Sequence, residues 1–442
     1  MSRSTAQQPA PVSRRIGTTQ AGPIDRWWWV EPTVWTQRML TALEKGVKGG
    51  MWFSLMDKVY SPKNLKAAWA RVRLNAGAAG IDKQTIDLFE KNEEWELQQL
   101  HEQLRDGRYR PLAVRRTWIN KPGSTDKRPL GIPAVRDRVV QTALRHTLEP
   151  IWEAEFAETS YGFRPGRGCL NALRRVDELL KQGYTWVVDA DLKKYFDTIP
   201  HDQLMEVVRQ RIADGRILDL IESYLRAGVM DGDEMQESEL GTPQGAVISP
   251  LLSNLYLNDL DHEAARQDFA MVRYADDFVI LCRSQGEAER ALAWVRGQVE
   301  AKGLTLHPEK TRLVDATQKG GFDFLGYHFE RGMRWPRKKS LDKLKERVRL
   351  ETPRTSGTSL LVIIVKLNQV LHGWFGYFKY SHKTTFGPID SWVRMRLRSI
   401  LRKRAGRKGR GRGADHHRWK NAFFAEQGLF GLAEAHALAC QS

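Results

Sequence analysis

Cysteines and long apolar runs are both scarce in this chain of 442 residues. The three cysteines, Cys169, Cys282 and Cys440, lie far apart and form no Cys-x-x-Cys pair. This spacing argues against a zinc site and for a reducing compartment, so we expect a cytoplasmic protein. No apolar run approaches the ~18 residues that a membrane span needs, and no apolar segment follows a basic one at the N-terminus. We therefore expect neither a membrane partner nor a secretory signal.

Acidic residues are scarce in the last quarter of the chain. The formal net charge is +17. Residues 331–442 hold 25 Lys and Arg but only 7 Asp and Glu, whereas residues 1–330 are close to balance, with 45 and 46. A merely basic surface would spread its charge along the chain. This concentration instead indicates a region that binds a polyanion.

What the chain does contain is two apolar segments that end in carboxylates. Residues 269–282 have the pattern of a β-hairpin with Asp276 and Asp277 at its turn, and residues 186–191 have the pattern of a buried strand that ends in Asp191. An Asp-Asp turn alone is usually only a solvated turn. Three carboxylates at one point are not explained as a solvated turn, because they repel one another. Each like-charged pair costs roughly 4 kcal/mol at about 4 Å and an effective dielectric constant of about 20. No Lys or Arg lies within these turns to offset the repulsion, so the pattern indicates bound divalent cations. Carboxylate oxygens are the ligands that Mg²⁺ prefers.

These segments belong to an ordered series of motifs. Asp191 is followed by Phe196, then by Gly241-Thr242-Pro243-Gln244-Gly245, and then by Tyr274-Ala275-Asp276-Asp277. The series resembles that of reverse transcriptases, and most closely that of proteins encoded by bacterial group II introns. Leu367-Asn368-x-x-Leu371-x-Gly373-Trp374-x-x-Tyr377-Phe378 also resembles the signature of the intron maturase domain. The resemblance runs from about residue 50 to about residue 405.

The resemblance implies an α+β protein with the right-hand polymerase fold. Its fingers and a palm with an antiparallel sheet would be followed by an all-helical thumb that doubles as the maturase (X) domain. We expect a partly disordered N-terminal extension over 1–49, fingers and palm over 50–330, the thumb over 331–405 and a basic tail over 406–442. The Trp cluster at residues 27–35 could stack on bases, but a segment pinned onto the main domain is the favoured interpretation.

The resemblance also implies a metal centre. Asp191, Asp276 and Asp277 would hold two Mg²⁺ ions, for which Mn²⁺ could substitute, and the backbone carbonyl of Leu192 would complete the second site. Two such ions clamp the attacking and the leaving oxygen of a phosphoryl transfer. Asp189 shares a strand face with Asp191, but Asp191 is the residue that fits the family pattern.

Four residues would contact the incoming deoxynucleoside triphosphate. Lys121 and Arg128 flank a predicted hairpin turn and would grip the triphosphate, although they could also be two solvated hairpin charges. Phe196 matches the ring that excludes a ribose 2′-OH, or is plain core. Gln244 matches a residue that packs against the nucleotide. Contacts with template or primer are implied for a larger set of residues: Arg164, Arg167, Lys310, Leu325, Gly326, Arg394, Arg398 and Arg402.

The predicted function is that of an RNA-directed DNA polymerase that extends a DNA primer on an RNA template. The same chain would bind its structured parent intron RNA and assist its splicing and mobility. It lacks the paired cysteines of the endonuclease that many intron proteins carry, so it resembles the endonuclease-free lineage, for which nascent strands or hairpin DNA are the expected primers. Two alternatives stay open. One is a free-standing reverse transcriptase in DNA repair or phage defence, and the other is an RNA-binding splicing cofactor with a vestigial polymerase, which the intact carboxylates disfavour.

Overall fold

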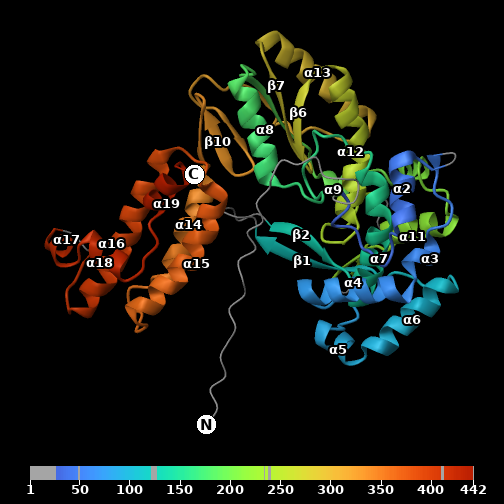
Figure 1. The fold of residues 1–442 in the computed structure, drawn as a ribbon, viewed down its shortest axis with the longest axis horizontal. Coiled ribbons are helices and arrows are strands. Elements are labelled where there is room, and N and C mark those ends of the chain that lie inside the picture. Colours follow the sequence, from blue (N-terminus) through green and yellow to red (C-terminus); the bar gives the residue numbers. More distant parts are fainter. Residues whose placement is uncertain are drawn as a thin grey trace.

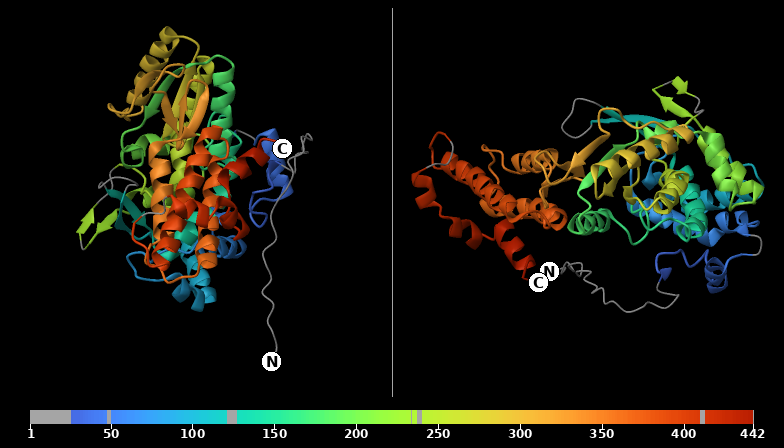
Figure 2. Two further views of the ribbon diagram at one scale, coloured as in Figure 1. Left: turned by 90° about the vertical axis from the view of Figure 1, so that its left-hand side faces the viewer. Right: turned by 90° about the horizontal axis from the view of Figure 1, so that it is seen from above.

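The computed structural model describes residues 26–47, 50–120, 127–232, 234–236, 240–409 and 413–441. The described chain folds as a right hand with fingers, a palm built on a sheet, and a helical thumb set to one side (Figure 1). Seen from above in Figure 2, the palm lies between the fingers and the thumb. The α+β right-hand architecture expected from the sequence is confirmed.

The fingers are built around one long helix. In α7 (Val135–Glu153), the apolar face expected from the spacing is fully buried, and it includes Val139, Ala143 and Leu148. The remaining elements are α2 (Gln37–Lys45), α3 (Met56–Val59), α4 (Pro62–Asn75), α5 (Ile86–Lys91), α6 (Glu93–Arg105), β1 (Val114–Asn120) and β2 (Lys127–Ile132). Strands β4 (Val229–Asp231) and β5 (Glu234–Gln236) extend the β1–β2 hairpin into a sheet of order β2-β1-β4-β5.

The N-terminal tryptophans pack onto this domain. Trp27 and Trp35 are buried, and the Trp35 indole Nε1–H donates a hydrogen bond of 2.9 Å to the carbonyl of His146 in α7. Trp35 also meets Trp52 edge to face. The favoured interpretation, a segment pinned onto the main domain, is therefore confirmed for these two rings, while Trp28 stays exposed.

The palm sheet is antiparallel and covered on both faces. Its strands β3 (Trp186–Asp191), β6 (Ala270–Tyr274), β7 (Asp277–Cys282) and β8 (Arg312–Asp315) lie in the order β6-β7-β3-β8. On one face, α8 (Cys169–Lys181) buries Val279 and Leu281 of β7, while Phe278 and Ile280 of the same strand belong to the core on the other face. This two-sided burial explains why β7 is apolar at every position after Asp277.

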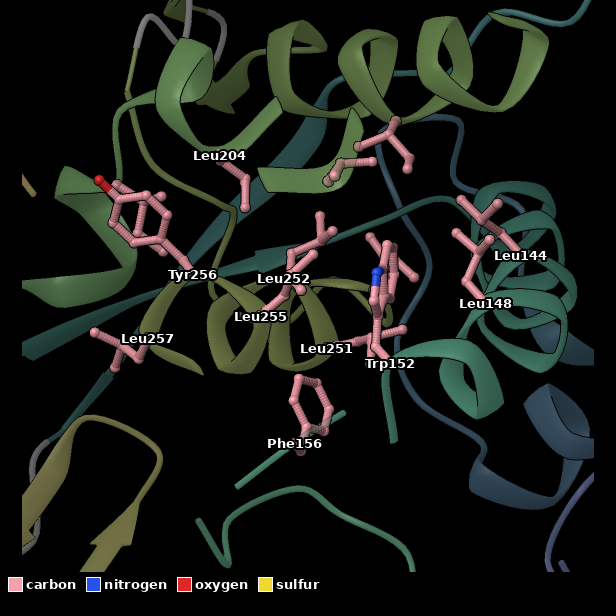
Figure 3. Close-up of a cluster of buried hydrophobic side chains, with 14 of the residues drawn as sticks. Leu144, Leu148, Trp152, Phe156, Leu204, Leu251, Leu252, Leu255, Tyr256 and Leu257 are labelled. Carbon is pink, nitrogen blue, oxygen red and sulfur yellow. The ribbon is translucent and has the colours of Figure 1, made fainter. Parts of the chain in front are cut away.

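Helices of the second face join palm to fingers. They are α9 (Tyr195–Thr198), α10 (His201–Arg209), α11 (Gly215–Arg226), α12 (Ser249–Arg266) and α13 (Gln285–Ala301). Figure 3 shows the leucines of α12, among them Leu251, Leu252 and Leu255, facing Trp152 and Leu204 from neighbouring helices. Because α12 is buried along most of its length, it is a fixed support for the hairpin β6–β7 beside it.

The thumb extends further along the chain than the sequence suggested. It comprises α14 (Lys338–Glu351), α15 (Leu360–Phe378), the 3₁₀ turn η2 (Lys383–Thr385), α16 (Phe386–Arg404), α17 (Ala414–Arg418), α18 (Asn421–Glu426) and α19 (Leu432–Ala439). Phe424 and Leu432 are fully buried in its core. The carboxylate of Asp390 accepts hydrogen bonds from the backbone N–H groups of Leu432 and Ala433, each at 3.0 Å. The expected boundary at residue 405 is therefore wrong, because most of the supposed tail packs into the thumb.

One thumb helix also bears on the expectation about membranes. Among the described residues, α15 is long and apolar enough to cross a membrane by length and composition, with a mean hydropathy of 1.2. Polar residues such as Lys366 and His372 interrupt its apolar run, which is why the sequence pattern missed it. Its inward residues Ile363, Leu367 and Leu371 pack into the thumb core. A single helix of this kind is weak support for a membrane span.

Candidate active site

The three carboxylates singled out in the sequence lie at one end of the palm sheet. Strands β3 and β7 pair with Asp191 directly opposite Asp277, and Asp276 lies in the two-residue turn between β6 and β7. The turn is tight because Ala275 has φ +59°, a left-handed conformation that costs a non-glycine residue about 1–2 kcal/mol. Strand register and turn geometry thus bring together side chains from distant parts of the sequence.

The electrostatics of the cluster follow from burial and like charge. Burial, and secondarily the negative charges of Asp189, Asp191 and Asp276, raise the pKa of Asp277 to about 8. Burial also raises the pKa of Asp276, with repulsion from Asp191 adding to it, while Arg128 and Lys310 act in the opposite direction. A cluster of carboxylates that resists ionisation is one that a cation would stabilise.

Two basic side chains partly offset the negative charge, contrary to the sequence argument. The Lys310 ammonium forms an ion pair with the carboxylate of Asp191, and the Arg312 guanidinium donates to Asp189 at 3.2 Å. Both come from the segment around β8, which pairs with β3 so that Asp189 lies opposite Arg312. Cross-strand pairing of opposite charges is the signal that was missed, since only the carboxylates' own turns were considered. Lys310, predicted to contact primer, thus lies on a predicted metal ligand.

The chemistry of these side chains suits divalent cations, but their oxygens do not yet surround a single metal position. Carboxylate oxygens are the ligands that hard divalent cations prefer, and the family uses such ions. Among the residues that the structure describes, no three acidic, imidazole or thiol groups already surround one metal position. Lys310 contacts one oxygen of the Asp191 carboxylate, Oδ2, and would compete with a cation for it.

The expected nucleotide contacts lie around one loop. The Phe196 carbonyl accepts a hydrogen bond of 2.6 Å from the N–H of Thr242, and a Cβ at Gly241 would lie 2.6 Å from the same carbonyl oxygen. Only glycine therefore fits there, and Gly241 also has φ +84°. The side-chain amide of Gln244 donates to Asp197 at 3.3 Å. Loop 241–245 thus fixes the backbone beside Phe196.

The second wall of this region is the hairpin β1–β2. The N–H of Gly131 in β2 donates to the carbonyl of Gln244 at 2.6 Å, so the hairpin lies against the loop. Arg128, on the same strand, lies opposite Ile119. Phe196, Gln244 and Arg128 therefore share one region, and their roles stay predictions. Lys121 lies outside the described residues.

The fingers arginines predicted to contact nucleic acid are engaged by the protein itself. Arg164 is 6% exposed and forms a bidentate pair with Glu153, with further hydrogen bonds to backbone carbonyls of residues 157 and 160. The predicted backbone contact of Arg164 is wrong for this structure, because no donor face is left for a phosphate. Arg167 is less enclosed and pairs with the exposed carboxylate of Glu158.

The predicted primer grip is a hairpin tied to the thumb. It belongs to a sheet of β9 (Phe322–Phe324), β10 (Tyr327–Glu330) and β11 (Met333–Pro336), and Leu325 and Gly326 form its turn, both with positive φ. The Tyr377 hydroxyl of α15 donates to the Leu325 carbonyl at 2.7 Å, and the Ser340 hydroxyl of α14 donates to the Gly326 carbonyl at 3.0 Å. A movement of the thumb would therefore move this turn as well.

Of the three thumb arginines predicted to contact nucleic acid, one is buried and two are partly exposed. Arg398 is 2% exposed, and its guanidinium donates to the Trp419 carbonyl at 2.9 Å and to the Asn421 side chain at 2.7 Å. Arg402 pairs with the buried carboxylate of Asp415 at 2.6 Å. The prediction of a direct nucleic-acid contact by Arg398 is therefore wrong for this structure, because its guanidinium holds the segment that joins α17 and α18 against α16. Arg402 is 26% exposed, and its contact with nucleic acid stays a prediction. Arg394 is partly exposed and stays a candidate contact.

Comparisons with known proteins agree with this arrangement. Residues 119–329 match the reverse transcriptase (RNA-dependent DNA polymerase) family, and residues 341–419 match the maturase-specific domain of group II introns. Protein YkfC of Escherichia coli K12 is 38% identical over 320 residues, which cover 63% of this chain and 83% of YkfC. The group II intron-encoded protein LtrA of Lactococcus lactis subsp. cremoris is 39% identical over 196 residues, 44% of this chain and 32% of LtrA.

Likeness to solved structures is weaker. A chain of a partial Cas6-RT-Cas1–Cas2 complex matches with 27% identity and a TM-score of 0.37, covering 56% of this chain and 41% of that chain. At that TM-score the superposition supports no conclusion about function. The family matches, which together extend through the palm and most of the thumb, are the informative result.

Proposed function

Because the chain belongs to the reverse transcriptases and maturases of group II introns, we propose that it copies RNA into DNA with two divalent cations and assists its parent intron in splicing and mobility. The observation that carries the polymerase half is the register of the palm. Asp191 and Asp277 lie opposite each other, and Asp276 lies in the adjoining turn. Their raised pKa values indicate a site that gains from a bound cation.

In the proposed reaction the primer 3′-hydroxyl attacks the α-phosphate of a deoxynucleoside triphosphate. Two Mg²⁺ or Mn²⁺ ions held by Asp191, Asp276, Asp277 and the carbonyl of Leu192 would supply charge for the attacking and leaving oxygens. Arg128 would add positive charge at the triphosphate. Loop 241–245 would hold the ring of Phe196 and the amide of Gln244 against the sugar and base. The turn at Leu325 would set the primer end, with Arg167 nearby on the template side.

Primer extension is the direct test of the polymerase half. A DNA primer annealed to an RNA template should be extended by the full chain with deoxynucleoside triphosphates and Mg²⁺, and EDTA should stop the reaction. A homopolymer template with its matching primer provides a sequence-independent control. A pure, folded preparation that gives no extension with either Mg²⁺ or Mn²⁺ would contradict the proposal.

The sugar selectivity of this reaction should depend on Phe196. Its backbone is held beside Gly241 and Thr242, and its half-buried ring packs against Tyr195. We propose that the exposed part of the ring would exclude a 2′-OH. We expect Phe196→Val to raise the relative use of ribonucleotides by at least about tenfold, because a lost steric contact of this size changes selectivity by such factors. The measurement compares kcat/KM for a ribonucleotide and the matching deoxynucleotide. An unchanged ratio would assign Phe196 to the core.

The maturase half is supported by the charge of the thumb and by its family match. The excess of basic residues lies beyond residue 330, and the maturase-specific match covers 341–419. Polyphosphate backbones are bound through such charges with release of counterions. We infer that structured intron RNA binds the thumb, and that the RNA template and DNA primer run between thumb and fingers.

Two thumb arginines should respond to mutation in different ways. Arg394→Ala should reduce the slope of log K against log salt for RNA binding by about one, as expected for one lost phosphate contact. Arg398→Ala should instead destabilise the thumb by about 2–4 kcal/mol, because a buried side chain is lost together with its bonds to the Trp419 carbonyl and the Asn421 side chain. Binding titrations at several salt concentrations and thermal melts distinguish these outcomes. A normal melt for Arg398→Ala would contradict its assignment as a structural residue.

A further inference from the structure

An arginine directly before the carboxylate turn is completely buried. Arg273 lies near the end of β6, and both it and its partner Asp261 in α12 have no exposed side-chain surface. All five N–H donors of the guanidinium are used. Nε and one Nη2 donor bind the Asp261 carboxylate, the other Nη2 donor binds the Ser160 hydroxyl at 2.9 Å, and the two Nη1 donors bind the Asn254 side chain at 3.1 Å and the Ala275 carbonyl at 2.9 Å. Only Arg offers five donors in one rigid plane.

The bond to Ala275 is the one that reaches the predicted active site. Ala275 is the left-handed residue of the turn, and Asp276 and Asp277 follow it directly. A non-glycine residue stays in that conformation only where its surroundings hold it. The guanidinium provides this restraint, since Nη1 binds the turn carbonyl while Nε and Nη2 are anchored to a helix that is itself buried.

A neighbouring loop closes around the same point. The backbone of Arg273 exchanges hydrogen bonds of 2.9 Å with Thr159 and Tyr161, and the Asn254 amide donates to the Gly162 carbonyl at 2.6 Å. A Cβ at Gly162 would lie 2.4 Å from the backbone nitrogen of Ala275. The loop therefore lies flat against the turn, and Arg273 joins helix, loop and turn in a single network.

We propose that Arg273 is a positioning residue, whose guanidinium fixes the turn that holds Asp276 and Asp277 beside Asp191. The proposal rests on the proposed two-cation polymerase site. A buried ion pair by itself is a poor source of stability, because the desolvation of both charges offsets their attraction. An apolar pair of similar volume would fill this site, but it could not bind the Ala275 carbonyl. Positioning is what the network adds.

The test uses a double variant that separates positioning from stability. Arg273→Met with Asp261→Leu removes both buried charges together, so no unpaired charge is left and the chain should still fold. Its thermal midpoint should fall, because the Ala275 carbonyl and the Ser160 and Asn254 side chains lose their donor. Its affinity for Mn²⁺, measured by electron paramagnetic resonance without nucleic acid, should fall by about tenfold or more. The kcat for primer extension should fall by a similar factor, while the Kd for primer–template, measured by fluorescence anisotropy, should stay within about twofold.

Arg145→Met with Glu149→Leu is the control for losing a bidentate Arg–carboxylate pair, although Arg145 is 38% exposed and the palm pair is fully buried. This pair in α7 is also bidentate, with bonds of 2.7 and 3.1 Å, but it does not contact the turn. It should change neither Mn²⁺ affinity nor kcat. A folded palm double variant with wild-type Mn²⁺ affinity and wild-type kcat would overturn the proposal.

Arg273→Lys decides the matter if the double variant does not fold. Lys keeps the positive charge beside Asp261 but has only three donors, too few for this network. Weakened Mn²⁺ binding with an intact fold supports positioning, and wild-type Mn²⁺ binding contradicts it. Because Mn²⁺ binding is read without catalysis, a wild-type chain that binds Mn²⁺ but extends no primer would count against the proposed function and leave this inference testable.

Discussion

Asp276→Asn should slow nucleotide addition on an RNA template by about three orders of magnitude, a loss of ~4 kcal/mol of transition-state stabilisation. Asp276 lies in the turn beside the Asp191–Asp277 pair, and an amide there cannot supply the negative charge that a divalent cation needs. The measurement is single-turnover extension of a primer by one nucleotide. Binding of primer–template should not weaken, because removing one negative charge lowers the repulsion between the site and the phosphates.

Asp189→Asn is the control for this experiment. Asp189 lies on the same strand as Asp191, but its carboxylate pairs with Arg312. We expect its rate to stay within a few-fold of the wild type. If Asp276→Asn also stays within a few-fold, the carboxylates have been assigned to the wrong chemistry.

The double variant Asp276→Asn with Asp277→Asn should melt at a higher temperature than the wild type in metal-free buffer, by a margin that depends on pH. Burial and like charge raise the pKa of Asp277 in the folded chain from 3.8 to about 8. Between these values the folded chain holds a proton that the unfolded chain releases, so the wild type loses stability as the pH rises. The stability that protonated Asp277 contributes is fully present below the pKa of the unfolded chain. It is lost as the pH rises through the pKa of the folded chain.

The margin between variant and wild type should therefore grow from pH 5 to pH 8 and level off above. Melts in EDTA at several pH values measure it. Added Mg²⁺ should stabilise the wild type and leave the variant unchanged. A margin that is constant over this range would show that Asp277 is not the group that titrates.

The same variant separates the two proposed activities. It should make no cDNA but still bind intron RNA and support splicing, because the maturase match lies in the thumb and does not include these carboxylates. Splicing rate at low Mg²⁺ and extension length are measured on one preparation, with circular dichroism as the control for folding. A folded variant that has lost splicing would contradict the separation.

The sequence was most informative where function depends on local order. An apolar strand ending in Asp191, and a hairpin with two carboxylates at its turn, were both predicted from spacing, and the structure contains both. The apolar character of β7 likewise predicted burial on both faces. These features follow from periods and spacings within single segments, which an isolated sequence displays directly.

Partners from distant segments could not be predicted in that way. Arg164, Arg398 and Lys310 looked like free positive charges, yet each has partners in the fold. The main partner of Arg164, Glu153, is only 11 positions away, but those of the other two are more distant. Lys310 pairs with Asp191 across 119 positions, and Arg398 binds the Trp419 carbonyl in a stretch that looked like a tail. Arg273 was overlooked because a single charge at the end of an apolar strand has no local pattern. The sequence shows which charged residues are present, but only the fold shows which of them already have partners.

The strand order of the palm also governs when the protein becomes active during its synthesis. β3 is the inner strand that carries Asp191, but both of its neighbours, β7 and β8, are translated later. At ordinary elongation rates, roughly ten seconds separate the emergence of Asp191 from that of Asp277. During this interval a nascent chain on the ribosome exposes both edges of an apolar strand, which chaperones would have to shield. Copying of RNA, including the message being translated, cannot start before the ribosome has passed Asp315.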